Sequence, residues 1–186
     1  MLAYVLWHRG GGDVERHTYE SRIARFHSAL AGVAPEGFSA SYVFVVGSLP
    51  WIQGEPVYEE WYLLDDYGAL GELERAVQGE ELADAHARVA ANSVSVTASL
   101  FGLRSGSGDP RPAAQATWLR KPADMSYADF DAAMVLALDE EGAGLWQRRL
   151  VLGSSSEFCL LADEQPFASS EIVVATARRD CLWAAG

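Results

Sequence analysis

The feature that most constrains the fold is an ordered set of similar segments on the two sides of a short polar linker. The linker, residues 105–114, is rich in Gly, Ser and Pro, which continue neither helix nor strand. Strand-like segments precede it at 3–10, at a strand that ends with 45–48, at 61–66 and at 94–99. Similar ones follow in the same order at 114–121, at a strand that ends with 151–154, at 158–163 and at 173–178. In each set a helix that opens near Tyr19 or Tyr127 follows the first strand. This order predicts an internal duplication.

Each copy has the order strand, helix, strand, strand, helix, strand, which is the split βαβ or ferredoxin-like arrangement. We therefore predict an α+β protein with a first repeat at 1–104 and a second at 115–186. The second repeat has only the segment 163–171 between its last two strands, where the first has residues 66–92. The second repeat is expected to lack most of its second helix.

Both faces of the predicted sheets need cover. In the segments AYVLWHRG and YVFVVG, both alternating sets of side chains are largely apolar, so neither face expects water. Helices cover only one face of a ferredoxin-like sheet. The sequence therefore predicts two antiparallel sheets packed against each other as an intramolecular α/β barrel. It leaves open whether the chain also forms a homodimer.

Two helices can be placed from their apolar spacing. Tyr19, Ile23, Phe26, Leu30 and Val33 form a single stripe. The second helix, about 66–92, has two apolar groups that are rotated relative to each other on either side of Gly79. Glycine is the weakest ordinary residue inside a helix, so we predict a break there.

Charge and cysteine usage exclude several classes of protein. The net charge of −12 repels phosphate backbones, which argues against nucleic acid and anionic membranes as partners. The N-terminus lacks the pattern of a signal peptide, and no apolar run approaches the ~18 residues of a membrane span. Cys159 and Cys181 match no zinc or redox spacing and fall on strands not expected to be neighbours. We expect a reduced, cytoplasmic protein without a disulfide.

Two acid pairs flank the third strand. Asp65 and Asp66 stand where a strand gives way to a helix, so they are expected to cap that helix. Glu59 and Glu60 point to opposite faces of the strand, so they cannot act as one pair. An inward glutamate is predicted either to be a base with a raised pKa or to pair with an arginine such as Arg9. Glu60 is the candidate catalytic carboxylate.

The histidines offer acid–base candidates without a metal site, because no local convergence of metal ligands is present. His27 lies at the flank of the first helical stripe, as either a boundary residue or a cavity-lining acid or base. His86 flanks the second helix, and His8 alternates with Trp7 on the first strand. Core packing or an aromatic-lined ligand pocket explains the strand aromatics Trp7, Tyr42, Trp61 and Trp118. The predicted ligand cavity contains these four aromatics, His8 and His86.

The segment RFHSALAGVAPEGF, residues 25–38, resembles the dimeric α/β-barrel superfamily, in particular its EthD-like and antibiotic-biosynthesis-monooxygenase-like branches. The resemblance covers residues 2–103 well and the second repeat only through its strands. It implies a cavity for a small, often aromatic molecule. It also implies functions that include cofactor-independent monooxygenases, polyketide cyclases, haem-binding proteins and proteins with no known activity.

The resemblance leaves three functions open. One is a metal-free enzyme acting on an aromatic or polyketide-like molecule, with His27 or Glu60 as the base. Another is a ligand-binding or scaffold protein without chemistry. The third is haem binding, since a histidine on the second helix resembles the axial ligand of the haem-handling branch. His86 would be that ligand, although the branch's Tyr, Trp and Asn partners have no residue-by-residue match in this sequence.

Overall fold

The computed structural model describes residues 1–135, 138, 142–150, 155–164 and 171–185. Its elements follow the order expected from the sequence, with a second helical region split into two pieces. They are β1 (Leu2–Gly10), α1 (Arg16–Val33), β2 (Phe38–Val46), β3 (Val57–Leu64), α2 (Tyr67–Gln78), α3 (Glu80–Ala90), β4 (Ser93–Gly106), β5 (Gln115–Leu119), α4 (Tyr127–Val135), β6 (Gly144–Arg149), β7 (Phe158–Ala162) and β8 (Val173–Ala185).

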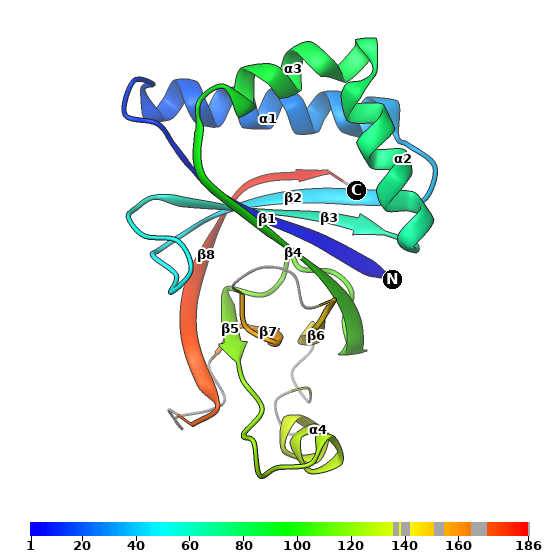
Figure 1. The fold of residues 1–186 in the computed structure, drawn as a ribbon, viewed down its shortest axis with the longest axis vertical. Helices are drawn as coiled ribbons and strands as arrows, with labels where there is room; N and C mark the ends of the chain where they lie inside the picture. Colours follow the sequence, from blue (N-terminus) through cyan, green and yellow to red (C-terminus); the bar gives the residue numbers. More distant parts are fainter. Residues whose placement is uncertain (136–137, 139–141, 151–154, 165–170, 186) are drawn as a thin grey trace.

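The eight strands close into one antiparallel barrel. Going around it, the order is β1-β3-β2-β8-β5-β7-β6-β4, and β4 returns to β1. Every pairing is antiparallel, including the β2–β8 and β4–β6 contacts that join the N-terminal strands to the C-terminal ones. The α+β class and the closed barrel within one chain agree with the sequence prediction (Figure 1).

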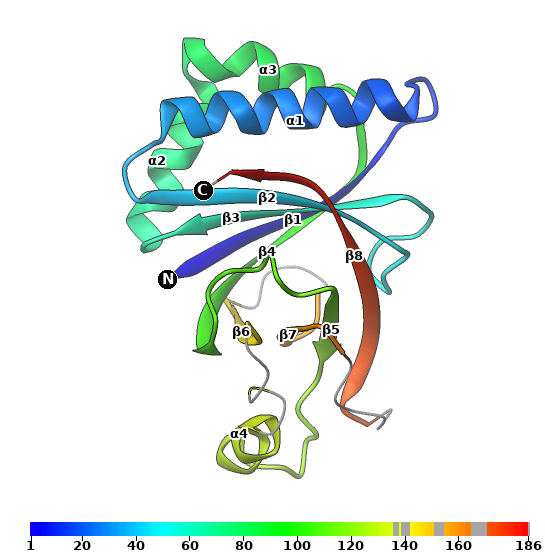
Figure 2. The same cartoon turned by 180° about the vertical axis from the view of Figure 1, so that it is seen from behind.

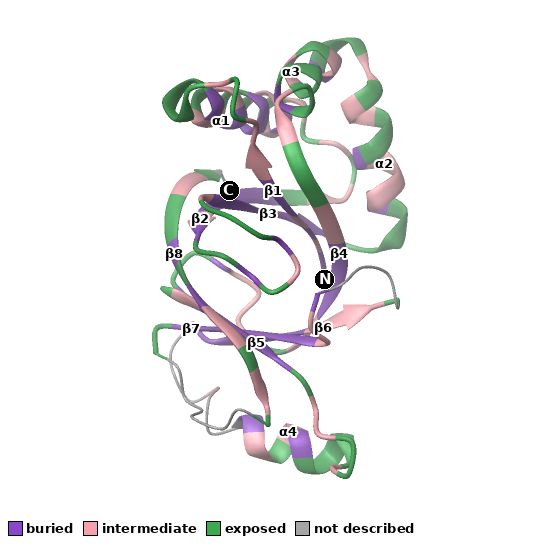
Figure 3. Ribbon diagram, turned by 60° about the vertical axis from the view of Figure 1, so that its left-hand side comes forward, coloured by how far each residue is buried: buried purple, intermediate pink, exposed green. Residues whose placement is uncertain are grey.

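Helices lie outside the barrel, on the outer faces of its strands, at opposite ends of the molecule. In Figure 1, α1, α2 and α3 form a layer above β1, β2 and β3, whereas α4 lies alone at the opposite end; Figure 2 shows the same arrangement from behind. One buried core fills the barrel, a second lies between the strands and α1–α3, and a third packs against α4. Strands β1, β2, β3, β5 and β7 are therefore buried over much of their length, whereas β8 and the start of β4 are more exposed (Figure 3).

Helix α1 packs on the sheet with the expected stripe. Tyr19, Ile23, Phe26 and Leu30 are buried, and Val33 packs at the edge of the same core. Of the two alternatives for His27, the boundary position is wrong, because its side chain is completely buried. The helix packs close enough to β2 and β3 that the flank beside Phe26 also meets the sheet, where polar partners receive the imidazole.

The predicted break in the second helical region is confirmed. Gly79 has extended backbone angles and separates α2 from α3. Asp66 caps α2, and its carboxylate accepts hydrogen bonds from the backbone N–H groups of Gly68 and Ala69. The prediction of a helix cap is therefore confirmed for Asp66. Asp65, the residue before it, is exposed.

Cys159 and Cys181 are both free, as expected. Their strands β7 and β8 lie on opposite sides of β5 and do not pair with each other. The expected match at 151–154 falls outside the described residues, as do residues 165–170, where the second helix of the second repeat is predicted to be missing. Among the helices that the structure describes, none has the length and apolar character of a membrane span.

Candidate functional site

Strand β3 places two adjacent glutamates on opposite sides of the sheet. Glu59 is opposite Trp7 in the β1–β3 ladder and points into the barrel, whereas Glu60 is opposite Leu6 and points toward the helices. Both carboxylates are buried, with residue exposures of 0% and 2%. The alternation predicted from the sequence thus produces two separate buried acidic sites.

Glu60 is the centre of a hydrogen-bonded cluster between the sheet and α1. Its Oε1 lies 2.7 Å from Nε2 of His8. Its Oε2 lies 3.3 Å from Nε2 of His27 and accepts a hydrogen bond from the Tyr62 hydroxyl. One carboxylate therefore bridges two imidazoles and a phenol, none of which is exposed by more than a few per cent.

The electrostatics of this cluster favour an ionised carboxylate. Burial by itself would raise the pKa of Glu60, but the charges of His8 and His27 and their hydrogen bonds hold that pKa well below its usual range. A raised pKa, as predicted for an inward glutamate, is therefore wrong for Glu60, because two basic groups converge on it. Burial and the neighbouring carboxylate raise the pKa of Tyr62 well above its usual range.

Each imidazole has a further polar partner on its far side. Nδ1 of His27 lies 2.8 Å from the Ser41 hydroxyl, and Nδ1 of His8 lies 2.7 Å from the Tyr19 hydroxyl. Tyr19 is in turn 2.7 Å from the hydroxyl of Ser93, at the start of β4. Both rings are thus fixed at two nitrogens, which sets their orientation toward Glu60.

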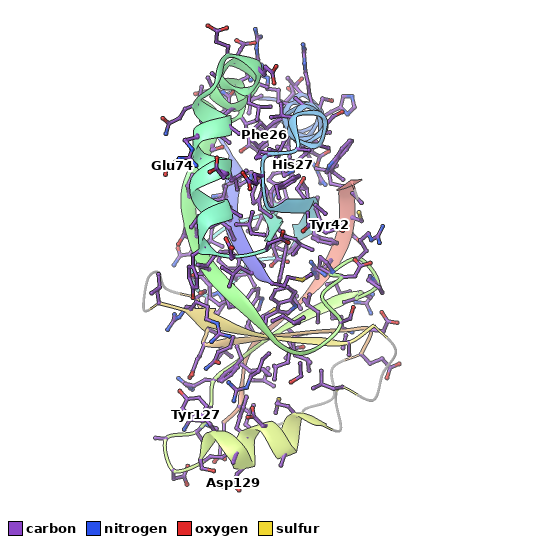
Figure 4. The ribbon with its side chains drawn as sticks, turned by 90° about the vertical axis from the view of Figure 1, so that its right-hand side faces the viewer. Phe26, His27, Tyr42, Glu74, Tyr127 and Asp129 are labelled. Atoms are coloured by element: carbon purple, nitrogen blue, oxygen red, sulfur yellow. The ribbon has the colours of Figure 1, made fainter. Side chains whose placement is uncertain are left out.

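A cleft adjoins this cluster between the sheet and the helices. Its main part has a volume of about 690 Å³ and is lined mostly by apolar and aromatic side chains, including Leu6, Phe26 and Leu73. Tyr62 and His86 line both this part and a smaller hollow of about 140 Å³, which also reaches His8, Glu60 and Ser93. Figure 4 shows Phe26 and His27 on α1 pointing into the region between this helix and the sheet, with Glu74 on the neighbouring helix α2.

The residues predicted to line one cavity divide between two faces of the sheet. His8 borders the smaller hollow, and His86 is exposed on α3 at the cleft. The four aromatics instead lie in the barrel core, where they are buried; they are Trp7, Tyr42, Trp61 and Trp118. The strands force this division, because Trp7 and His8 alternate along β1. A single cavity containing all six residues is therefore excluded by the geometry.

The barrel core holds the other buried acid in a different setting. Glu59 accepts hydrogen bonds from the indoles of Trp7 and Trp61 at 2.9 and 2.8 Å and forms an ion pair with Arg179 at 3.1 Å. The guanidinium also donates to the backbone oxygens of Pro110 and Ala113. The pairing of an inward glutamate with Arg9 is wrong in detail, because Arg9 reaches the backbone oxygen of Gln53 instead.

Three functional candidates were not singled out from the sequence. Tyr62 and Tyr19 belong to the Glu60 cluster, and Arg179 belongs to the Glu59 site. Tyr62 stands two positions after Glu60 on one strand, so the period-two rule already places both on the same face. Tyr19 was identified only as part of the apolar stripe, and the β8–β2 pairing that brings Arg179 into the barrel needs the three-dimensional structure.

Comparison with known proteins supports the fold alone. The chain is similar to the structure of an anthrone oxidase-like protein (10% identity, TM-score 0.57, covering 99% of this chain and 92% of the other). It is also similar to a candidate monooxygenase from Lactobacillus acidophilus (11% identity, TM-score 0.53, covering 99% and 95%). A third similar structure is a candidate chlorite dismutase (12% identity, TM-score 0.50, covering 97% and 95%). No family model matches the chain, and no curated protein matches its sequence.

Proposed function

We propose that the chain binds a small, largely apolar aromatic ketone in the helix–sheet cleft and removes a proton from it, as the first step of an oxygenation or cyclisation that needs no cofactor. The observation that carries this proposal is that one residue, Tyr62, belongs both to the lining of the cleft and to the Glu60 cluster. Tyr62 lines the apolar cleft and donates its hydrogen bond to a buried carboxylate that two histidines hold. Cleft volumes of this size suit small-molecule ligands.

The lining determines which ligand chemistry fits. Most of the cleft lining is apolar or aromatic and consists of Tyr4, Leu6, Phe26, Leu70, Leu73 and Val77. Among the described lining residues, Glu74 contributes a carboxylate. A neutral aromatic molecule gains from burial there, whereas an anion meets repulsion from Glu74. One structure of similar fold is an anthrone oxidase-like protein. We therefore choose anthrone, a neutral tricyclic ketone, as the first probe.

The proposed chemistry begins at the Tyr62 hydroxyl. The ketone loses a proton to the oxygen of Tyr62 while Tyr62 passes its own proton to Glu60, so the negative charge moves to the enolate of the ketone and Glu60 becomes neutral between His8 and His27. Glu60 with a lowered pKa is a weak base alone, so the carboxylate and the imidazoles act as one unit. For anthrone, dioxygen then accepts electrons from the carbanion; one oxygen atom remains as the new quinone carbonyl and the other leaves as water.

The test is oxygen uptake and quinone absorbance with anthrone, for wild-type protein, Glu60→Gln, Tyr62→Phe and the control His17→Gln. His17 is exposed on the same helix as His27. We expect the first two variants to lose about 10²- to 10⁴-fold in rate, the usual contribution of general acid–base catalysis. The control keeps the wild-type rate. Turnover by Glu60→Gln at the wild-type rate contradicts the proposal.

A second candidate is a ligand-binding protein without chemistry. It is favoured by one observation: both oxygens of Glu60 already accept hydrogen bonds from protein groups. In that case anthrone binds, raising the melting temperature, but no oxygen is consumed. Glu60→Gln then changes stability and leaves ligand affinity nearly unchanged.

Haem fits the cleft poorly. His86 is exposed at the cleft and offers one nitrogen ligand. However, the described lining contains Glu74 and no Arg or Lys, so the two propionates of a haem meet a carboxylate rather than a cation. Haem is therefore not part of the proposed chemistry.

We further propose that the chain is a tandem duplication within the monooxygenase-like part of the dimeric α/β-barrel superfamily. The order of its strands supports this proposal. Residues 1–104 and 115–186 are the proposed repeats. Their strands have the same spatial order, β4-β1-β3-β2 in the first and β8-β5-β7-β6 in the second. An expressed fragment 1–104 that forms a defined dimer with native-like circular dichroism supports the duplication, whereas an unfolded monomer argues against it.

A further inference from the structure

The Glu60 cluster has a hydrogen-bonded connection to the protein surface. From Oε1 of Glu60 it runs 2.7 Å to Nε2 of His8, then 2.7 Å from Nδ1 of His8 to the hydroxyl of Tyr19. It continues 2.7 Å to the Ser93 hydroxyl, which lies 3.0 Å from the backbone oxygen of Val89. Glu60, His8 and Tyr19 are buried, whereas Ser93 is half-buried.

Counting protons along this connection gives two arrangements. If Ser93 donates to Val89, then Tyr19 donates to Ser93 and Nδ1 of His8 donates to Tyr19. Because the ionised carboxylate of Glu60 can only accept, Nε2 of His8 also carries a proton in this arrangement. If instead His8 is neutral with its proton on Nε2, then Tyr19 donates to His8 and Ser93 donates to Tyr19. In that second arrangement the Ser93 proton no longer points at Val89.

The two arrangements differ by one proton on His8 and by the direction of both hydroxyls. We propose that Tyr19 and Ser93 are a proton relay that loads and unloads the buried Glu60–His8 pair from solvent. A proton delivered at Ser93 displaces the Ser93 proton to Tyr19 and the Tyr19 proton to Nδ1 of His8. The reverse transfer removes it, so no buried group has to move.

The path through Tyr19 and Ser93 is a hydrogen-bonded connection from Nδ1 of His8 to a half-buried hydroxyl. Tyr58 stacks on the imidazole at 5.5 Å between ring centroids, and its hydroxyl turns away to donate to Glu20. On the other side of Glu60 lie His27 and Tyr62, and the ring of Tyr4 packs against Tyr62. Burial raises the pKa of Tyr58 to about 12, so its phenol stays neutral, as does that of Tyr19. Each relay hydroxyl therefore always holds one proton to pass on.

The relay also touches the cleft. Val89 is near the C-terminal end of α3, the helix that carries His86, and Ser93 borders the smaller hollow with His8 and Glu60. The Ser93–Val89 hydrogen bond exists only in the arrangement with the extra proton. Loading a proton therefore strengthens the anchor between the end of α3 and β4.

The test uses the free protein with ¹⁵N-labelled histidine and measures the rate at which the His8 ring N–H exchanges with water. Tyr19→Phe removes one hydroxyl of the relay and keeps the ring. Tyr58→Phe is the matched control, because it removes the hydroxyl of a ring that contacts the same imidazole outside the relay. We expect exchange in Tyr19→Phe to slow by about two- to tenfold, the rate equivalent of losing one hydrogen bond of ordinary strength, with Tyr58→Phe unchanged.

Ser93→Ala interrupts the outer step and provides a second variant if Tyr19→Phe does not fold. Exchange at the wild-type rate in the variants that fold overturns the relay, and so does an equal slowing in Tyr58→Phe. The inference gains its catalytic meaning from the proposed function, but the exchange measurement needs no substrate. A failure with anthrone and a failure of the relay are therefore separate results.

Discussion

Glu59 and Glu60 are neighbours in sequence, both are buried, and yet they occupy opposite kinds of site. Glu59 is held inside the barrel by two indoles and a guanidinium, which keep their protons at neutral pH. Glu60 is held by two imidazoles and a phenol beside a cleft. A carboxylate whose partners cannot titrate near neutral pH stabilises a structure, whereas one whose partners can titrate is able to exchange protons.

The Glu59 side of this comparison predicts the largest effect on stability. Arg179→Met leaves Glu59 as an uncompensated charge inside the barrel, which typically destabilises a protein by about 3–5 kcal/mol. Urea unfolding monitored by tryptophan fluorescence measures it. The double variant Glu59→Gln/Arg179→Met is expected to recover a large part of the loss, because no charge then remains buried. A single variant with wild-type stability contradicts a structural role for the pair.

The Glu60 side predicts a smaller loss of stability. Glu60→Gln replaces a carboxylate that is hydrogen-bonded to His8 and Tyr62 and forms an ion pair with His27. Leaving buried donors without good acceptors costs about 1–3 kcal/mol. We expect a folded protein with a lower urea midpoint than wild type. A loss as large as that of Arg179→Met removes the distinction between the two sites.

The same variant has a defined pH dependence. The pKa of Glu60 is lowered in the folded state, so its contribution to stability is complete above the unfolded-state pKa of about 4.3 and disappears as the pH falls toward the lower folded-state value. The stability difference between wild type and Glu60→Gln should shrink as the pH falls below the unfolded-state pKa of about 4.3. A difference that grows in acid contradicts the ion-pair description of the cluster.

The charge of the cleft predicts a modest effect on binding. Glu74→Gln removes the carboxylate from the cleft lining, so an anionic fluorescent probe such as anilinonaphthalene sulfonate should bind a few-fold more tightly, in line with about 1 kcal/mol for an exposed charge. Glu72→Gln is the control, because Glu72 lies on the same helix outside the lining and pairs with Arg75. Equal changes in both variants indicate a general effect of net charge.

The smallest effect is expected at His86. This side chain is exposed, so His86→Ala should change stability by no more than about 0.5 kcal/mol. Hemin titration of wild type and variant should give the same absorption spectrum. A saturable Soret shift that is lost in His86→Ala would overturn the conclusion that haem fits the cleft poorly.

Local chemistry explains which parts of the fold were predictable. The helix break at Gly79 and the cap at Asp66 depend on neighbours within a few residues, so the sequence predicts them directly. The opposite orientation of Glu59 and Glu60 follows from the strand period alone. The closed barrel followed from strands that are apolar on both faces.

The sites were less predictable because their partners are distant in the chain. Arg179 reaches Glu59 across 120 positions, and no local pattern distinguishes it from Arg9. His27 was identified as a candidate, but its full burial depends on how closely α1 packs on β2 and β3. The aromatics on the strands were assigned to a cavity because composition alone cannot separate a packed interior from an open one.

One chain supplies all eight strands of the barrel, and this has a consequence for how the protein can change. In a barrel built from two identical chains, symmetry repeats every substitution, so each improvement near one cleft alters an equivalent position elsewhere. Here each substitution occurs once. The face of β1, β3 and α1 and the face beneath α4 can therefore change independently of each other.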